Sequence, residues 1–107
     1  MNDIARKSIL FVDDEERLLQ GLQRMLRPMR GLWDMEFLTS GTEAIRRLGE
    51  RCFDVIVSDM KMPEVDGATL LHEARNICPS CIRMVLSGQA EPTSVLRATQ
   101  VAHQYMS

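Results

Sequence analysis

The stretch Ser8-Ile-Leu-Phe-Val-Asp-Asp14 decides the fold of this chain. Residues 8–12 are uncharged and mostly large and apolar, which is typical of a central strand that is covered on both faces. Two aspartates follow at once and end the strand. In open parallel sheets, ligands bind beyond the carboxyl ends of the strands, so acidic residues at this position indicate a candidate site.

The remaining sequence repeats the pattern of a short apolar run followed by an amphipathic stretch, which indicates a parallel α/β sheet. Four further strands are predicted, at residues 33–38, 53–58, 82–86 and 103–106. Helices are predicted between them. Their apolar stripes are Leu18, Leu19, Leu22, Met25 and Leu26; Ala44, Ile45 and Leu48; Leu70, Leu71, Ala74 and Ile77; and Val95, Leu96 and Thr99.

Polar residues predict where the helices begin. Asp14 is expected to cap the first helix, which ends by Pro28, and Ser40 with Glu43 is expected to form a capping box on the second. Asp66 and Gly67 open the third helix. Five strands with four intervening helices predict one α/β domain with a doubly wound parallel five-stranded sheet, in which the helix after the last strand is absent.

The composition excludes several classes of protein. A chain of 107 residues forms one domain, and a net charge of −2 disfavours a protein that grips nucleic acid through its phosphates. Arg24, Arg27 and Arg30 are interpreted as a solvated helix face. No apolar run approaches the roughly 18 residues of a membrane span, and the N-terminus has no signal-peptide core. We therefore expect a cytoplasmic protein that neither enters a membrane nor binds nucleic acid directly.

The three cysteines predict no disulfide, because their number is odd and we expect a reducing compartment. Cys78-Pro-Ser-Cys81 has the CxxC spacing, but it follows a helix, whereas redox motifs stand at a helix N-terminus. The pair also lacks the further ligands of a zinc site.

Acidic and hydroxyl residues end three of the predicted strands. Asp13 and Asp14 follow the first strand, Asp59 ends the third, and Ser87 ends the fourth. Crowded carboxylates repel one another unless a cation neutralises them, and Mg²⁺ suits an open cleft with few carboxylates and several waters. A carboxylate beside such an ion can attack a phosphoryl group. The alternative is that these residues serve only as helix caps and turn residues.

Four segments in this order resemble the response-regulator receiver family, the phosphoacceptor domains of two-component signalling. The matching segments are Ile9–Glu15, Asp54–Pro63 with Asp66-Gly67 after it, Met84–Gly88, and Tyr105 on the fifth strand. The resemblance covers nearly the whole chain. It implies a flavodoxin-like sheet with the strand order 2-1-3-4-5.

The resemblance also implies roles for single residues. Asp59 would accept a phosphoryl group from a histidine kinase or a phosphotransfer protein. Asp14 and Asp59 would bind Mg²⁺ directly, Asp13 through water, and Lys61 through its backbone carbonyl. Ser87 would contact the phosphoryl group and Tyr105 would swing inward, so that the domain switches between two states. Such a domain is not an enzyme, although it assists its own phosphorylation and dephosphorylation.

The sequence departs from the family at its end. Members of the family carry a lysine at the end of the fifth strand that pairs with the phosphoryl group, and in this chain it would come directly after Ser107. The fifth helix is missing as well. We therefore expect that residues 1–107 are an incomplete receiver domain, with any output domain beyond residue 107. A homodimer through the uncovered apolar strip is the alternative. Residues 89–93 and 101–105 resemble receivers joined to HD-type phosphohydrolase-like output domains.

Two other functions are alternatives. A degenerate receiver would take no phosphate and would act only as an interaction module, but every acidic residue of the motif is present. A haloacid-dehalogenase-like phosphatase carries a second acid two residues after its nucleophile, where this chain has Lys61.

Overall fold

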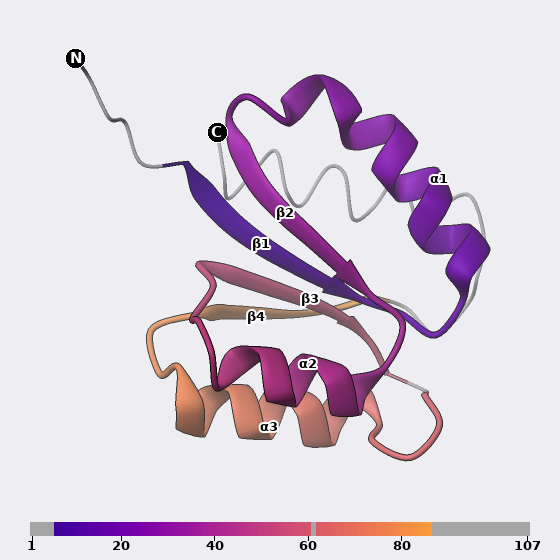
Figure 1. Ribbon diagram of the computed structural model, residues 1–107. Helices are drawn as coiled ribbons and strands as arrows, with labels where there is room; N and C mark the ends of the chain where they lie inside the picture. The colour runs from indigo at the N-terminus through magenta and orange to yellow at the C-terminus, as the bar shows by residue number, and fades with distance from the viewer. Residues whose placement is uncertain (1–5, 61, 87–107) are drawn as a thin grey trace.

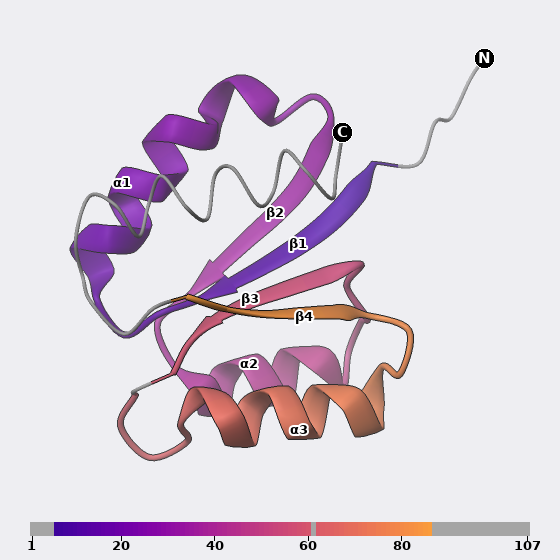
Figure 2. The ribbon, with the colours of Figure 1, turned by 180° about the vertical axis from the view of Figure 1, so that it is seen from behind.

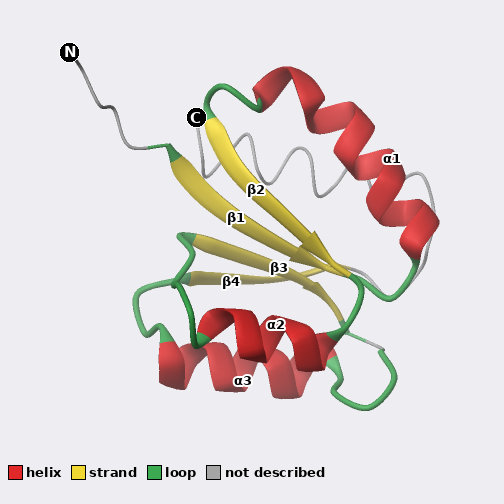
Figure 3. Cartoon of the chain, in the orientation of Figure 1, coloured by secondary structure: helices red, strands yellow, loops and turns green. Residues whose placement is uncertain are grey.

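A computed structural model describes residues 6–60 and 62–86 of the chain. It contains a parallel sheet in which four strands lie in the order β2-β1-β3-β4 (Figures 1 and 3). This order confirms the expected fold class for the four strands. The strands are β1 (Lys7–Val12), β2 (Trp33–Leu38), β3 (Val55–Asp59) and β4 (Ile82–Leu86). The predicted fifth strand and the helix before it lie outside the described residues.

Helices cover both faces of the sheet. Helix α1 (Glu16–Leu26) continues into a short 3₁₀ turn, η1 (Arg27–Met29), and lies on one face. Helices α2 (Gly41–Leu48) and α3 (Gly67–Ile77) lie side by side on the other face, as the front and rear views show (Figures 1 and 2). Figure 3 shows the resulting three layers of helix, sheet and helix.

Strand β1 is the centre of the sheet and supplies both halves of the core. It pairs with β2 on one side and with β3 on the other. Ile9 and Phe11 pack in the cluster under α1, whereas Leu10 and Val12 pack in the cluster under α2 and α3. All four side chains are at most 1% exposed. This alternation confirms that residues 8–12 form a strand covered on both faces.

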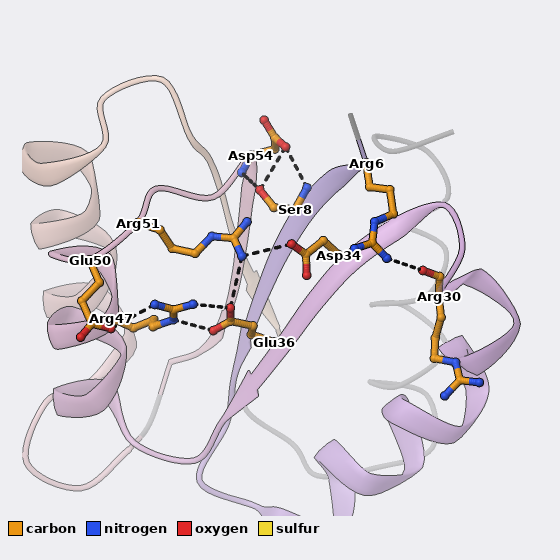
Figure 4. Close-up of polar contacts among 9 residues, drawn as sticks. All are labelled: Arg6, Ser8, Arg30, Asp34, Glu36, Arg47, Glu50, Arg51 and Asp54. Carbon is orange, nitrogen blue, oxygen red and sulfur yellow. Dashed lines mark hydrogen bonds and ion pairs between the residues drawn. The ribbon is translucent and has the colours of Figure 1, made fainter. Parts of the chain in front are cut away.

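The amino ends of β1 and β3 are joined by polar contacts. The Asp54 carboxylate accepts hydrogen bonds from the Ser8 backbone amide at 2.8 Å and from the Ser8 hydroxyl at 3.1 Å (Figure 4). The Asp54 amide donates to the same hydroxyl at 2.9 Å. These contacts support the pairing register in which Ile9 lies opposite Val55.

Two of the predicted helix caps are confirmed and one is wrong. Ser40 and Asp66 accept from the backbone amides of Glu43 and Thr69. Asp14 does not cap α1, because its position is one residue too early; the cap residue is Glu15, which makes no side-chain cap. The Glu43 side chain pairs with Arg46, so the reciprocal half of the capping box is not formed.

Two predicted core residues lie at the margins of their stripes. Met25 of α1 is 45% exposed and Ile77, the last residue of α3, is 37% exposed. Because Met25 directly precedes the buried Leu26, its side chain leaves the helix in a different direction and lies outside the buried stripe. Ile77 lies where α3 ends. Periodicity identified the correct helix faces but placed their borders too far out.

The cysteine prediction is wrong for one pair. A disulfide joins Cys52, in the loop before β3, to Cys78 at the end of α3, with a Cα–Cα distance of 5.7 Å. Since β3 and β4 are neighbours, the segments that precede them meet at the amino end of the sheet. Cys81 is a buried free thiol, so the CxxC pair is not bonded to itself.

Reduction of this disulfide is expected to lower the free energy of unfolding by roughly 3 kcal/mol, because it releases a long loop in the unfolded chain. The two cysteines are separated by 26 residues. Urea unfolding with and without a thiol reductant measures the difference. Cys52→Ser is the control, since its stability should not respond to the reductant. Equal stability of the oxidised and reduced native chain would contradict the prediction.

Candidate metal centre at the carboxyl end of the sheet

Three carboxylates converge where β1 and β3 end. Because these strands pair in parallel with Val12 opposite Ser58, the residues that follow reach the same edge of the sheet. Asp13, Asp14 and Asp59 each offer a carboxylate oxygen, and these oxygens lie within 4.8 Å of one another. Asp13 and Asp59 are buried, whereas Asp14 is exposed. The structure thus brings together the acidic residues singled out in the sequence.

Asp13 is held rigidly in an unfavourable environment for a charge. Its amide donates to the Leu38 carbonyl at 3.1 Å, and its carboxylate accepts from the Glu15 amide at 2.8 Å. Burial raises the pKa of Asp13 to about 6, and the neighbouring charges of Asp59, Asp14 and Glu15 add to this effect against the opposing Glu15 hydrogen bond. This carboxyl is therefore stabilised by a proton or by a cation.

Asp59 is fixed by its own backbone surroundings. One carboxylate oxygen accepts from the Met60 amide at 2.9 Å, and the Ser58 hydroxyl donates to the Asp59 carbonyl at 2.8 Å. The residue is 8% exposed. A side chain that is both oriented and close to the surface can meet a group that approaches from solvent.

Gly67 lies directly against the backbone of Asp59. Its amide donates to the Met60 carbonyl at 2.8 Å. A Cβ atom at residue 67 would lie 2.1 Å from the Asp59 carbonyl oxygen and 2.7 Å from the Met60 Cα atom. No side chain fits there unless the chain at the end of β3 moves. The sequence placed Gly67 at the start of the third helix, and the contact with Asp59 appears only in the structure.

The loop from β3 to α3 packs against the start of α2. A Cβ atom at Gly41 would lie 2.6 Å from the Val65 carbonyl oxygen. Glu64, in the same loop, has a positive φ of 64°, which costs most residues about 1–2 kcal/mol. Residues 64–67 at the end of this loop thus pack closely against the start of α2 and the end of β3.

The donors present fit a hard divalent cation. Carboxylate oxygens are the ligands that Mg²⁺ prefers, and the exposed Asp14 leaves the site open to water. The buried Asp13, with its raised pKa, shows a charge that a cation would stabilise. Asp13, Asp14 and Asp59 are therefore the residues able to hold the ion. Three other residues that the sequence implicates, Lys61, Ser87 and Tyr105, lie outside the described residues.

In metal-free buffer, the chain is expected to lose stability as the pH rises from about 4 to about 6, because folded Asp13 keeps a proton that the unfolded chain releases. The pKa of Asp13 is about 6 in the folded chain and 3.8 in the reference state. The full loss from this group is about 3 kcal/mol. Urea unfolding across this pH range measures it.

Asp13→Asn tests the assignment, because the amide does not titrate and should flatten this part of the curve. Asp14→Asn is the matched control: it removes an exposed charge and should keep most of the slope. An equal decline in native chain and Asp13→Asn would show that another group is responsible.

Comparison with known proteins agrees with this geometry. A family model described as the response regulator receiver domain matches residues 9–106. The hydrogenase transcriptional regulatory protein HoxA of Bradyrhizobium diazoefficiens is 33% identical over 94% of this chain, and the match covers 20% of that protein. The sensor kinase CckA of Brucella abortus is 38% identical over 78% of this chain, and the match covers 9% of that protein. The chain thus spans only a small part of both relatives.

Solved structures share the fold. The signal receiver domain of an HD domain-containing protein from Pseudomonas fluorescens superposes with a TM-score of 0.73 at 32% identity, covering 94% of this chain and 79% of that one. The receiver domain of the hybrid histidine kinase CckA superposes with a TM-score of 0.75 at 27% identity, covering 94% and 99%. With the family model matching 98 consecutive residues (9–106) and the strand order agreeing, the chain belongs to the response-regulator receiver family of two-component signalling.

Proposed function

We propose that the chain is the phosphoacceptor of a two-component phosphorelay and that Asp59 is the residue phosphorylated. The observation that carries this proposal is the convergence of Asp13, Asp14 and Asp59 within 4.8 Å at the carboxyl end of the sheet. Membership of the receiver family supports it, and so do the relatives that are sensor and hybrid histidine kinases.

The reaction moves a phosphoryl group from a phosphohistidine of the partner to Asp59. A carboxylate oxygen of Asp59 forms a bond to phosphorus while the phosphorus–nitrogen bond breaks, and the leaving imidazole takes a proton from solvent. Phosphoryl transfer depends mainly on positioning and on neutralising charge. The Met60 amide orients the Asp59 carboxylate for attack, and the Gly67 contact holds the backbone behind it.

Mg²⁺ is the proposed cofactor, and when bound it neutralises the carboxylates and the incoming phosphoryl oxygens. Asp14 and Asp59 would hold it directly, Asp13 through water, and Lys61 through its backbone carbonyl. Ser87 and Tyr105 are proposed to couple the phosphoryl group to a change of conformation. These roles rest on the family resemblance.

The proposed partners are a sensor histidine kinase or a phosphotransfer protein on the input side. On the output side we propose a further domain of a longer polypeptide or a separate partner, and the HD-type class is supported by the similarity to the Pseudomonas receiver. A cytoplasmic location fits this role. Among residues 6–60 and 62–86, no helix is long and apolar enough to cross a bilayer. A degenerate receiver that serves only as an interaction module is the competing function.

Incubation with Mg²⁺ and a small acyl phosphate is expected to add one phosphoryl group to the protein, because the acidic cluster can position the donor without a kinase. Intact-mass spectrometry detects the addition. Asp59→Asn should abolish it, and removal of Mg²⁺ by a chelator should abolish it as well.

Asp66→Asn is the matched control for this experiment. It makes the same chemical change at an exposed acid that caps α3, and asparagine caps helices equally well. This variant should be phosphorylated like the native protein. No addition to a native chain that extends past residue 107 would favour the competing function, and addition that persists in Asp59→Asn would show that another residue is phosphorylated.

Gly67→Ala is expected to slow phosphorylation strongly and to lower the free energy of unfolding by roughly 1–3 kcal/mol, because its methyl group must displace the Asp59 backbone. Gly31→Ala is the control, since a Cβ atom at Gly31 meets nothing within 4 Å. The initial rate of phosphorylation and the urea midpoint measure the two effects. A Gly67→Ala protein that reacts at the native rate would show that this contact does not position Asp59.

A further inference from the structure

We propose that a cavity beside α1 and β2 binds a small ligand carrying two or more phosphate groups. The cavity has a volume of about 540 Å³, within the roughly 300–1,000 Å³ of small-molecule sites. Arginines from three segments of the chain line it. The described residues around it are Arg6, Gln20, Gln23, Arg24, Arg27, Arg30, Trp33, Asp34, Met35 and Phe37.

The charge of this lining is strongly one-sided. Four of its residues are arginines and one, Asp34, is acidic. The Asp34 carboxylate is already engaged by Arg51, which lies outside the cavity, at 3.1 Å (Figure 4). The arginine charges of the cavity are therefore not neutralised by its own acid.

Of the six described arginines outside the cavity, Arg46, Arg47 and Arg51 form ion pairs, whereas Arg17, Arg75 and Arg83 do not. Arg47 forms a double contact to Glu36 with both distances 2.7 Å, and Arg51 pairs with Asp34 (Figure 4). Arg46 pairs with Glu43. By contrast, the guanidinium groups of Arg24 and Arg27 make no ion pair within residues 6–60 and 62–86. Unpaired guanidinium groups around one cavity favour the binding of an anionic ligand.

One guanidinium group is held in place. Arg6 donates from Nη1 to the Arg30 carbonyl at 3.1 Å, which ties the segment before β1 to the turn after η1 (Figure 4). Arg24, Arg27 and Arg30 follow one another at three-residue spacing along α1 and η1, so their charges are spread along the cavity. Guanidinium forks match phosphate oxygens in pairs, and a spread of several forks suits several phosphate groups better than one carboxylate.

The remaining lining is suited to the rest of such a ligand. Met35 and Phe37 are half-buried and offer an apolar surface, and Gln20 and Gln23 offer amide donors and acceptors. A nucleoside diphosphate combines phosphates with a planar ring and hydroxyl groups. It is the simplest probe that uses both parts of the lining.

The cavity is separate from the acidic centre. Arg6 precedes the first residue of β1, whereas Asp13 and Asp14 follow the last one. None of the carboxylates of the acidic centre lines the cavity. The two sites therefore share no residue, and they can be tested apart.

Isothermal titration of the protein with pyrophosphate and with ADP tests the proposal, in a chelating buffer so that no metal bridges phosphate to Asp59. Binding with a Kd of about 1 mM or below is expected for at least one of them. The double variant Arg24→Gln/Arg27→Gln should weaken it at least about tenfold, since both charge-assisted contacts are lost. The Asp59→Asn variant should bind as the native protein does.

The matched control is the double variant Arg17→Gln/Arg75→Gln, which removes the same charge from exposed positions outside the cavity. It should keep native affinity. Three results would overturn the proposal: no binding of either probe at about 10 mM, an equal loss of affinity in both double variants, or binding of a single-stranded oligonucleotide without binding of pyrophosphate or ADP. Circular dichroism of each variant checks that it is folded.

Discussion

The parallel pairing of β1 with β3 is the constraint on which the rest of this domain depends. With Val12 opposite Ser58, the two strands end at the same level, so Asp13 and Asp59 are forced together. Carboxylates this close repel each other, and the burial of Asp13 makes its charge still less favourable. The site therefore exists at a cost in stability, and the remainder of the fold must offset that cost.

The central strand supplies that stability. Raising the pKa of a carboxyl by about two units corresponds to roughly 3 kcal/mol. Burial of one large apolar side chain contributes about 1.5–3 kcal/mol. Ile9, Leu10 and Phe11 are each essentially inaccessible, so their burial is large enough to offset the cost of a charged Asp13, which comes first from its burial and then from the neighbouring acids. The strand and the site are thus one unit, and a change in register would lose both.

The sequence predicted the features that depend on residues close together in the chain or on the pattern of the family. The central strand at residues 8–12, the Ser40 and Asp66 caps and the strand order could be inferred, because each rests on local chemistry or on a family pattern. Cys52 and Cys78 could not be paired in advance, since only the neighbouring of β3 and β4 brings them together. The same holds for Gly67, whose contact with Asp59 arises from the path of the loop between them. The prediction that Asp14 caps α1 is wrong, because the helix begins one residue later than a cap at Asp14 would require.

Net charge was a poor guide to where charge lies. The formal net charge of the 107 residues is only −2. In the fold, three carboxylates lie together beyond the carboxyl end of β1. Four arginines surround a cavity whose lining includes Arg6, the residue before the amino end of β1. Nearly equal numbers of acidic and basic residues give a small net charge, but the two kinds of charge lie at different places in the fold. Because salt screens interactions beyond about 8–10 Å, each cluster is felt locally by whatever approaches it. A nearly neutral receiver can therefore present acidic side chains beyond one end of its central strand and basic side chains near the other; the sequence located the acidic group, whereas the fold was needed to bring the arginines of separate segments together.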